Sequence, residues 1–311
     1  MSAGKQPTLG LALGGSGSRT SFYIGFLEVF DEQAVKVDYI TASSGASIVA
    51  SAYACGALKQ IKEWALSLEN DTLKQYISPG KRGGLYSLDG MEQKMREFTK
   101  DLTFDQVRPL MSFAAVDLDS GEQINLCMGD IAKACRISCT LPGVFEPQKW
   151  GNRTLVDGGL LNLVPVNALK QFPVDVTVGV DIPGTKFIFT GGQMTLRKVF
   201  NTIKKMLFID EMEHLLYRAF GEKEIDFEKN LGFFSVLGRS MDLAIKANKN
   251  LEEQDLVCDL MIVPDIPKLK PALYVQFNPF YELGRECALA YLPQIKSVIQ
   301  KKQEQEEKVH A

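Results

Sequence analysis

The chain has 311 residues, 45% of them hydrophobic, which is enough for the core of one large α/β domain or of two smaller domains. Lys and Arg total 35 against 38 Asp and Glu, so the formal net charge is -3. This balance gives no electrostatic basis for nucleic-acid binding as the main activity, and an anionic partner has to meet a local patch of charge.

The N-terminal residues and the cysteines limit the compartment and the cofactors. Residues 1–8 lack the apolar stretch and cleavage site of a secretory signal, and no later apolar run approaches the ~18 residues of a membrane-spanning helix. The sequence therefore predicts a cytoplasmic protein. The six cysteines show none of the short paired spacings of a zinc site, so we expect free thiols and no metal or organic cofactor.

Two strand-turn-helix units open the chain. Residues 9–13 predict a short buried strand, and the glycine-rich residues 14–18 must turn before helical spacing resumes over 22–30. Residues 35–41 predict a second strand. Residues 47–55 predict a helix of mostly small side chains, which can pack closely on a sheet.

The rest of the first 265 residues continues to alternate helices with strands. We expect helices at 60–68, 88–99 and 131–139, and strands at 112–116, 123–127, 154–156, 174–180 and 259–263. Such alternation favours a mostly parallel central sheet covered on both faces, which is a three-layer α/β/α architecture. No linker divides the chain, and the charge-rich residues 301–311 predict a solvated helix end.

Residues 185–255 have a different, helix-rich and amphipathic character. An apolar stripe at helical spacing runs from Leu196 to Leu207, with lysine and arginine on the other faces. Two interpretations stay open. One is a helix packed on the sheet with a solvated basic side, and the other is a lid or membrane-facing helix that gives residues 194–250 a peripheral membrane contact.

A candidate nucleophile lies in the second strand-turn-helix unit. A serine hydroxyl becomes reactive when a base takes its proton, and ester cleavage also needs donors aimed at the developing oxyanion. Ser44 follows the strand at 35–41 and precedes the helix at 47–55, where a sharp turn exposes a nucleophile at the end of a sheet. The loop at residues 14–17 offers backbone N–H groups that can converge on an anion.

The scarcity of histidine points to a carboxylate as the base. The chain has only two histidines; His214 lies in a helix-like polar segment and His310 in the charged tail, so a Ser-His-Asp triad is disfavoured. Asp157 lies at the end of the predicted strand at 154–156, followed by two glycines that permit a tight turn. It is the best-placed base, although an Asp-Gly turn without catalytic role is the structural alternative.

The same glycine loop partly imitates a dinucleotide-binding fingerprint. Gly15 and Gly17 follow a strand, and Asp38 lies further along the chain. However, Thr20 occupies the place of the third glycine, and Asp38 opens a strand instead of closing one. We therefore disfavour nucleotide binding.

Together these motifs resemble those of the patatin-like phospholipases, lipid acyl hydrolases with a Ser-Asp dyad in an α/β fold. Three motifs carry the resemblance in the right order: the glycine-rich anion loop at residues 11–19, the nucleophile elbow at residues 42–46 and the Asp-Gly-Gly motif at residues 157–159. Residues 138–145 also resemble the segment that precedes the aspartate in this family, and residues 160–166 the one that follows it.

The resemblance implies a patatin-like hydrolase domain over residues 7–265, with a C-terminal helical segment at 266–311 packed on the same domain. It further implies hydrolysis of phospholipid or lysophospholipid esters, with Ser44 as nucleophile and Asp157 as base. The oxyanion loop comprises Gly15, Ser16 and Gly17, with Arg19 fixing the loop or favouring an anionic headgroup.

Four positions depart from the family pattern. Ala42 and Ala46 replace the two glycines of the elbow, Ser16 replaces a loop glycine, and Thr20 stands where glycine is usual. These changes motivate one alternative, a catalytically weakened lipid-binding or regulatory protein that keeps the fold. A second alternative within enzymes is an esterase or acyltransferase that acts on soluble esters.

Overall fold

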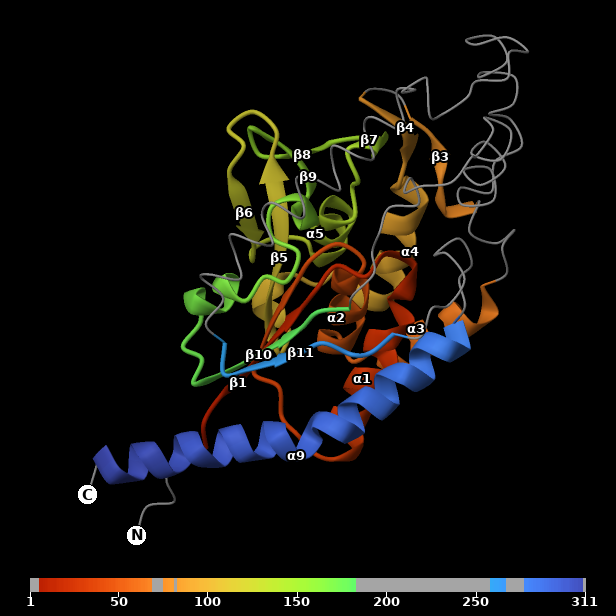
Figure 1. The fold of residues 1–311 in the computed structure, drawn as a ribbon. Helices are drawn as coiled ribbons and strands as arrows, with labels where there is room; N and C mark the ends of the chain where they lie inside the picture. The colour runs from red at the N-terminus through yellow and green to blue at the C-terminus, as the bar shows by residue number, and fades with distance from the viewer. Residues whose placement is uncertain (1–5, 69–74, 81–82, 183–257, 267–276, 310–311) are drawn as a thin grey trace, which may run out of the picture.

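A computed structural model describes residues 6–68, 75–80, 83–182, 258–266 and 277–309 of the chain (Figure 1). The amphipathic stripe from Leu196 to Leu207, the expected membrane contact at 194–250 and His214 lie outside these described residues. Among the described residues, no helix combines the length and the hydropathy that crossing a membrane requires.

A mixed central sheet organises the molecule. In sheet order its strands are β11 (Leu260–Ile262), β10 (Val176–Val180), β1 (Leu9–Leu13), β2 (Tyr39–Ala42), β5 (Leu110–Asp117), β9 (Arg153–Asp157) and β8 (Gln148–Trp150), and β6 (Gln123–Leu126) also pairs with β5. The first five strands are parallel, whereas β6, β9 and β8 pair antiparallel with their neighbours. The predicted, mostly parallel sheet is confirmed.

Side chains of β1 alternate between the two faces of the sheet. Leu9, Leu11 and Leu13 join a large core with the helices, whereas Ala12 joins a smaller cluster with residues 164–169. Both faces are therefore buried, which explains why the sequence of β1 is apolar throughout. This layering is the predicted three-layer α/β/α fold.

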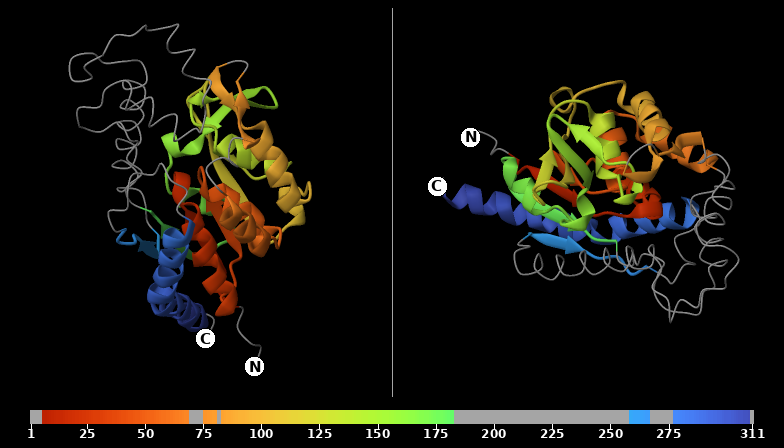
Figure 2. Two further views of the ribbon diagram at one scale, coloured as in Figure 1. Left: turned by 90° about the vertical axis from the view of Figure 1, so that its right-hand side faces the viewer. Right: turned by 90° about the horizontal axis from the view of Figure 1, so that it is seen from above.

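The helices cover the larger core (Figures 1 and 2). They are α1 (Ser21–Glu32), α2 (Ala46–Ala54), α3 (Leu58–Ser67), α4 (Asp89–Thr99), α5 (Ile131–Ser138) and α9 (Phe277–Val309). The short 3-10 helices η4 (Gly158–Leu160) and η5 (Asn167–Gln171) follow the Asp-Gly-Gly motif. Each of the five helices from α1 to α5 lies within two residues of its predicted bounds.

Two parts of the sequence prediction need correction. The strand expected from residue 35 begins only at Tyr39, because Ala34 takes the left-handed conformation and the Val35 N–H bonds the Phe30 carbonyl at the end of α1. The Asp38 carboxylate accepts the Leu9 N–H at 3.0 Å. Asp38 thus joins the starts of two strands, far from the carboxyl ends where a nucleotide would bind.

A second, three-stranded sheet was absent from the prediction. It consists of β3 (Ser78–Pro79), β4 (Gly84–Ser87) and β7 (Gly143–Phe145). Its strands are two to four residues long and contain glycine and proline, so they carry no alternating pattern to detect. The parallel pairing of β4 with β7 joins segments about sixty residues apart, which local sequence does not encode.

Helix α9 packs against α1 (Figure 2), and each helix places a glycine against the backbone of the other. A Cβ atom at Gly25 would lie 2.1 Å from the Tyr281 carbonyl oxygen, and one at Gly284 would lie 2.0 Å from the Phe22 carbonyl oxygen. The backbones can approach so closely only because both residues lack a side chain. Arg285 strengthens the contact through a two-nitrogen pair with Glu32, both distances being 2.8 Å.

We expect Gly284→Ala to lower the free energy of unfolding by about 1 to 3 kcal/mol, because the added methyl group would force the two helices apart. Chemical denaturation followed by circular dichroism measures this change. Ser297→Ala, on an exposed face of the same helix, is the control and should change stability by less than ~0.5 kcal/mol. A Gly284→Ala protein as stable as the parent would contradict the close crossing.

Candidate active site

The register of β5 brings the candidate nucleophile and base together. Strand β2 pairs with β5 until Ala42 lies opposite Phe113, and β9 pairs with β5 until Asp157 lies opposite Ala115. Strand β6 pairs with β5 at both positions, so β2 and β9 share the other edge. They run toward each other along this edge and end two β5 residues apart. Ser44, two residues beyond β2, therefore meets the end of β9.

Ser44 forms a strained elbow between β2 and α2. Its φ of 52° lies in the left-handed region, which costs a residue with a side chain about 1 to 2 kcal/mol. The Ser44 N–H donates to Ser138 Oγ at 3.0 Å, and the Ser47 N–H and hydroxyl both donate to the Ser44 carbonyl. These contacts hold the elbow in its strained conformation.

Small residues around Ser44 let the elbow fit between a strand, a helix and the glycine loop. A Cβ atom at Gly45 would lie 2.5 Å from Thr20 Oγ1, so the position next to the serine must be glycine. Ala42 and Ala46 are fully buried, and neither has a positive φ. The strain therefore falls on Ser44 itself, and the two alanines are accommodated.

Asp157 is a buried carboxylate with two hydrogen-bond donors. Its Oδ2 accepts the Ser44 hydroxyl at 2.7 Å, and its Oδ1 accepts the Gly159 N–H at 2.8 Å. Burial raises the pKa of Asp157 to about 6, although the hydrogen bonds from Ser44 and Gly159 act in the opposite direction. A carboxylate of this pKa is ionised near neutral pH and is a stronger base than an exposed aspartate.

The glycine loop lies beside the elbow, but only part of it has free donors. The Gly14 N–H bonds the Val180 carbonyl, and the Gly15 N–H bonds the Leu163 carbonyl, each at 2.9 Å. The Gly15 N–H, one of the three expected oxyanion donors, therefore already has an acceptor. Within the described residues, the N–H groups of Ser16 and Gly17 donate no hydrogen bond.

Two of the unusual residues of the loop contact each other. The hydroxyl oxygens of Ser16 and Thr20 lie 3.1 Å apart, and Thr20 also donates to the Gly17 carbonyl at 2.6 Å. Ser16 is buried, and its side chain lies against that of Thr20. Ser16 and Thr20, the two departures from the family pattern in this segment, thus link the start of the loop to its end through their side chains.

Arg19 is a buried residue that contacts the glycine loop. Its N–H donates to the Ser16 carbonyl at 3.1 Å, and its side chain is 7% exposed. Burial lowers the pKa of its guanidinium from a very high ordinary value, so the group stays charged at neutral pH.

Sequence reasoning assigned no role to two residues that hold the candidate dyad. Ser138 accepts the Ser44 N–H, and the Thr140 carbonyl accepts the Asp157 N–H at 2.8 Å. The first contact spans 94 residues along the chain, and no local pattern marks a serine that will meet a distant N–H group. The family-like segment at 138–145 was the only signal that could have drawn attention to them.

With this geometry established, the comparisons with known proteins identify the family. The family model for patatin-like phospholipases matches residues 11–170, which include the glycine loop, the elbow and the Asp-Gly-Gly motif. The chain therefore belongs to the patatin-like phospholipase family.

Curated relatives are longer proteins of the same kind. The chain is 28% identical over 301 residues to the uncharacterized NTE family protein Rv2565 of Mycobacterium tuberculosis, a match that covers 92% of this chain and 46% of that protein. It is 27% identical over 181 residues to the uncharacterized NTE family protein Rv1063c of the same organism, covering 58% of this chain and 50% of that protein. The chain thus spans about half the length of these relatives.

A solved structure shares the fold. VipD from Legionella pneumophila aligns with a TM-score of 0.51 and 15% sequence identity, over 94% of this chain and 67% of that one. At this identity the likeness concerns the fold alone, and it agrees with the three layers described above.

Burial of Asp157 predicts a stability that depends on pH. Because its folded pKa of about 6 exceeds the unfolded value of about 3.9, ionising this group opposes folding as the pH rises from about 4 to 7. Asp157→Asn removes the ionisation, so its stability relative to the parent should grow by about 2 to 3 kcal/mol between pH 4 and pH 8.

Urea denaturation at a series of pH values measures this difference. The control is Asp119→Asn, which removes a carboxylate from an exposed position in the β5–β6 hairpin. If the difference in unfolding free energy between Asp157→Asn and the parent stays constant across this pH range, the pKa of about 6 for Asp157 is contradicted.

Proposed function

We propose that the chain is a serine acyl hydrolase that cleaves carboxylic esters of lipids, of the phospholipase or lysophospholipase type. The observation that carries the proposal is the 2.7 Å hydrogen bond from Ser44 Oγ to Asp157 Oδ2 at the strained elbow. The N–H groups of Ser16 and Gly17, which have no acceptor in the part of the chain that the structure describes, are the third part that ester cleavage needs. Membership of the family supports a lipid ester as the substrate.

The first half of the proposed reaction acylates the serine. Ser44 Oγ attacks the ester carbonyl carbon while Asp157 takes the hydroxyl proton, and the N–H groups of Ser16 and Gly17 stabilise the oxyanion of the tetrahedral intermediate. The intermediate collapses when the carbon–oxygen bond to the alcohol breaks. Asp157 returns its proton to the departing oxygen, which leaves an acyl ester on Ser44.

The second half releases the acid. Asp157 removes a proton from a water molecule, whose oxygen attacks the acyl carbon, and the oxyanion again lies against the same N–H groups. Breaking the bond to Ser44 Oγ then frees the fatty acid and restores the serine hydroxyl with the proton from Asp157. Neither half of this sequence calls for a metal ion or an organic cofactor.

The alternative of a lipid-binding protein without activity rested on Ala42, Ala46, Ser16 and Thr20. All four fit the structure without moving Ser44 away from Asp157, which favours the hydrolase over this alternative. The esterase and acyltransferase alternatives use the same nucleophile and differ only in the ester or the acceptor. They are separated by substrate and not by the geometry of the dyad.

We expect a fluorophosphonate probe to label Ser44, because the activated hydroxyl displaces fluoride from phosphorus as Asp157 takes the proton. Intact mass spectrometry and peptide mapping measure the label. Ser44→Ala should abolish labelling and lower turnover of a phospholipid ester by more than about 10³-fold, whereas Ser120→Ala, at an exposed serine, should change neither. A folded parent protein that takes up no label would overturn the proposed activity.

The same preparation distinguishes the classes of substrate. Hydrolysis of long-chain phospholipid or lysophospholipid in vesicles or micelles is compared with that of short-chain soluble esters. Preference for the long-chain lipids supports the proposal, whereas equal or better turnover of soluble esters would favour the general esterase.

The pH profile of kcat/KM tests the base. Since only the ionised carboxylate can accept the serine proton, kcat/KM should fall about tenfold per pH unit below a pH of about 6. Initial rates between pH 4 and pH 8, on protein shown to stay folded, measure this limb. Rates that remain level down to pH 4 would exclude Asp157 as the base.

A further inference from the structure

The end of helix α5 contacts both members of the proposed dyad. Ser138 is the last residue of the helix, and its Oγ accepts the Ser44 N–H at 3.0 Å. Two residues later, the Thr140 carbonyl accepts the Asp157 N–H at 2.8 Å. One tripeptide therefore fixes the backbone of the nucleophile and the backbone of the base relative to each other.

The hydrogen bonds of Ser138 have a fixed direction. Its hydroxyl donates to the Ala114 carbonyl at 2.8 Å, on the β5 residue between the two at which β2 and β9 end. The single hydroxyl proton is thus used, and a lone pair faces the Ser44 N–H. Ser138 is fully buried, so its hydroxyl is held inside the protein.

The Ser44 N–H has no other partner among the described residues. It comes after the last residue of β2 and before the first turn of α2, so neither the sheet nor the helix supplies an acceptor. Ser44 is partly buried, and an N–H without a partner costs up to about 1 to 3 kcal/mol where it is fully buried, which is similar to the strain at the left-handed Ser44. Without Ser138, the elbow loses one of the contacts that oppose relaxation of its φ and keeps only those from Ser47 to the Ser44 carbonyl.

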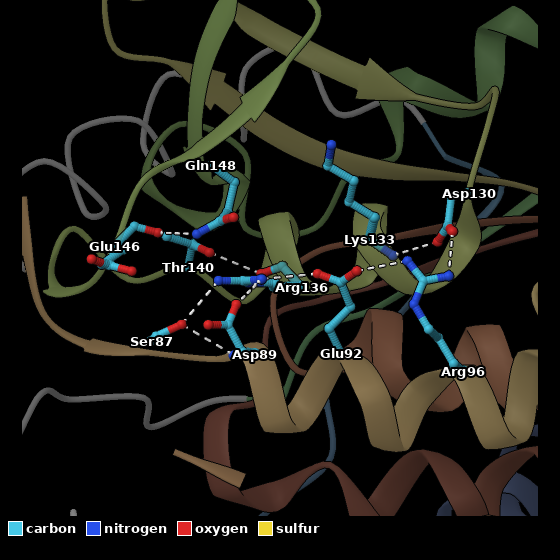
Figure 3. Close-up of polar contacts among 10 residues, drawn as sticks. All are labelled: Ser87, Asp89, Glu92, Arg96, Asp130, Lys133, Arg136, Thr140, Glu146 and Gln148. Carbon is cyan, nitrogen blue, oxygen red and sulfur yellow. Dashed lines mark hydrogen bonds and ion pairs between the residues drawn. The ribbon is translucent and has the colours of Figure 1, made fainter. Parts of the chain in front are cut away.

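An ion-pair cluster fixes the end of α5 to α4 (Figure 3). The buried Arg136 places Nη1 2.5 Å from Asp89 and 2.9 Å from Glu92, and its Nη2 donates to Ser87 Oγ at 3.1 Å. The Thr140 hydroxyl donates back to the Arg136 carbonyl at 2.9 Å. The last turn of α5 is therefore held by contacts of both the Arg136 side chain and the Arg136 carbonyl.

We propose that Ser138 is a positioning residue for the nucleophile, and that Arg136 acts through it by holding the end of α5 in place. This inference rests on the proposed function, because it assigns these residues to the geometry of the same dyad. Neither side chain touches the reacting atoms. Their role is to keep Ser44 Oγ within hydrogen-bond distance of Asp157 Oδ2.

The test compares Ser138→Ala with Ser51→Ala. Ser51 is also a fully buried serine, and its hydroxyl bonds a backbone carbonyl of α2, but it does not contact the dyad. Ser138→Ala should lower kcat by about 10- to 100-fold and leave KM within about twofold, since a displaced nucleophile slows the chemical step. Ser51→Ala should keep the parent kcat, even though each variant loses one buried hydroxyl.

The pH profile gives a readout that a purely structural role does not change. The hydrogen bond from Ser44 lowers the pKa of Asp157, so its loss should move the acid limb of kcat/KM to higher pH. Arg136→Lys, which cannot reproduce the contacts of two guanidinium nitrogens, should lower kcat less and move the limb in the same direction. It also tests the inference if Ser138→Ala does not fold.

A crystal structure of Ser138→Ala separates failure of this inference from failure of the proposed function. Loss of the positive φ at Ser44, or a Ser44 Oγ to Asp157 Oδ2 distance beyond hydrogen-bond reach, supports the inference whether or not the parent turns over lipid. An unchanged elbow, or a parent-like kcat and acid limb in an active protein, overturns it. An inactive and unlabelled parent overturns the proposed function alone.

Discussion

The site depends on one constraint, the pairing of two opposed strands with a single edge of β5. Strand β2 is parallel to β5 and β9 is antiparallel to it, so their C-terminal ends face each other along that edge. A slip of one residue in either strand would turn its side chains to the other face and break the meeting of Ser44 with Asp157. The long-range pairing of β2 and β9 with β5 therefore determines that Ser44 and Asp157 lie next to each other.

The backbone segments at this edge of β5 approach each other so closely that some positions require glycine and Ser44 takes a strained conformation. A Cβ atom at Gly158 would come within 2.3 Å of the Ala114 backbone of β5, and one at Gly45 would lie 2.5 Å from Thr20 Oγ1 and 3.0 Å from the Gly17 carbonyl oxygen. The left-handed Ser44 and the buried Asp157 each oppose folding by an amount comparable to a large part of a domain's net stability. The large core of helices and parallel strands stabilises the fold enough to offset these local losses.

The sequence predicted the parts that follow from local patterns. The five helices from α1 to α5 and the parallel strands were accessible because apolar spacing and small-residue turns are local signals, whereas the meeting of Ser44 with Asp157 was expected from the resemblance to the patatin-like family. Contacts made by distant backbone groups were not. The acceptor of the Gly15 N–H is 148 residues away, at Leu163, and the Ser44 N–H meets Ser138; both depend on how loops pass one another after the sheet has formed.

Two departures from the family pattern, Ser16 and Thr20, are explained by their contact with each other. A glycine loop without side chains can adopt many conformations, so its N–H groups converge only if other contacts restrict it. Here Ser16 and Thr20 supply such contacts through their own hydroxyl groups, and Thr20 also lies against Gly45 of the elbow. Replacing glycine at these positions reduces the freedom of the unfolded chain and links the loop to the nucleophile. The loop is therefore held by a different set of contacts, and the proposed oxyanion donors Ser16 and Gly17 have no acceptor for their N–H groups among the described residues.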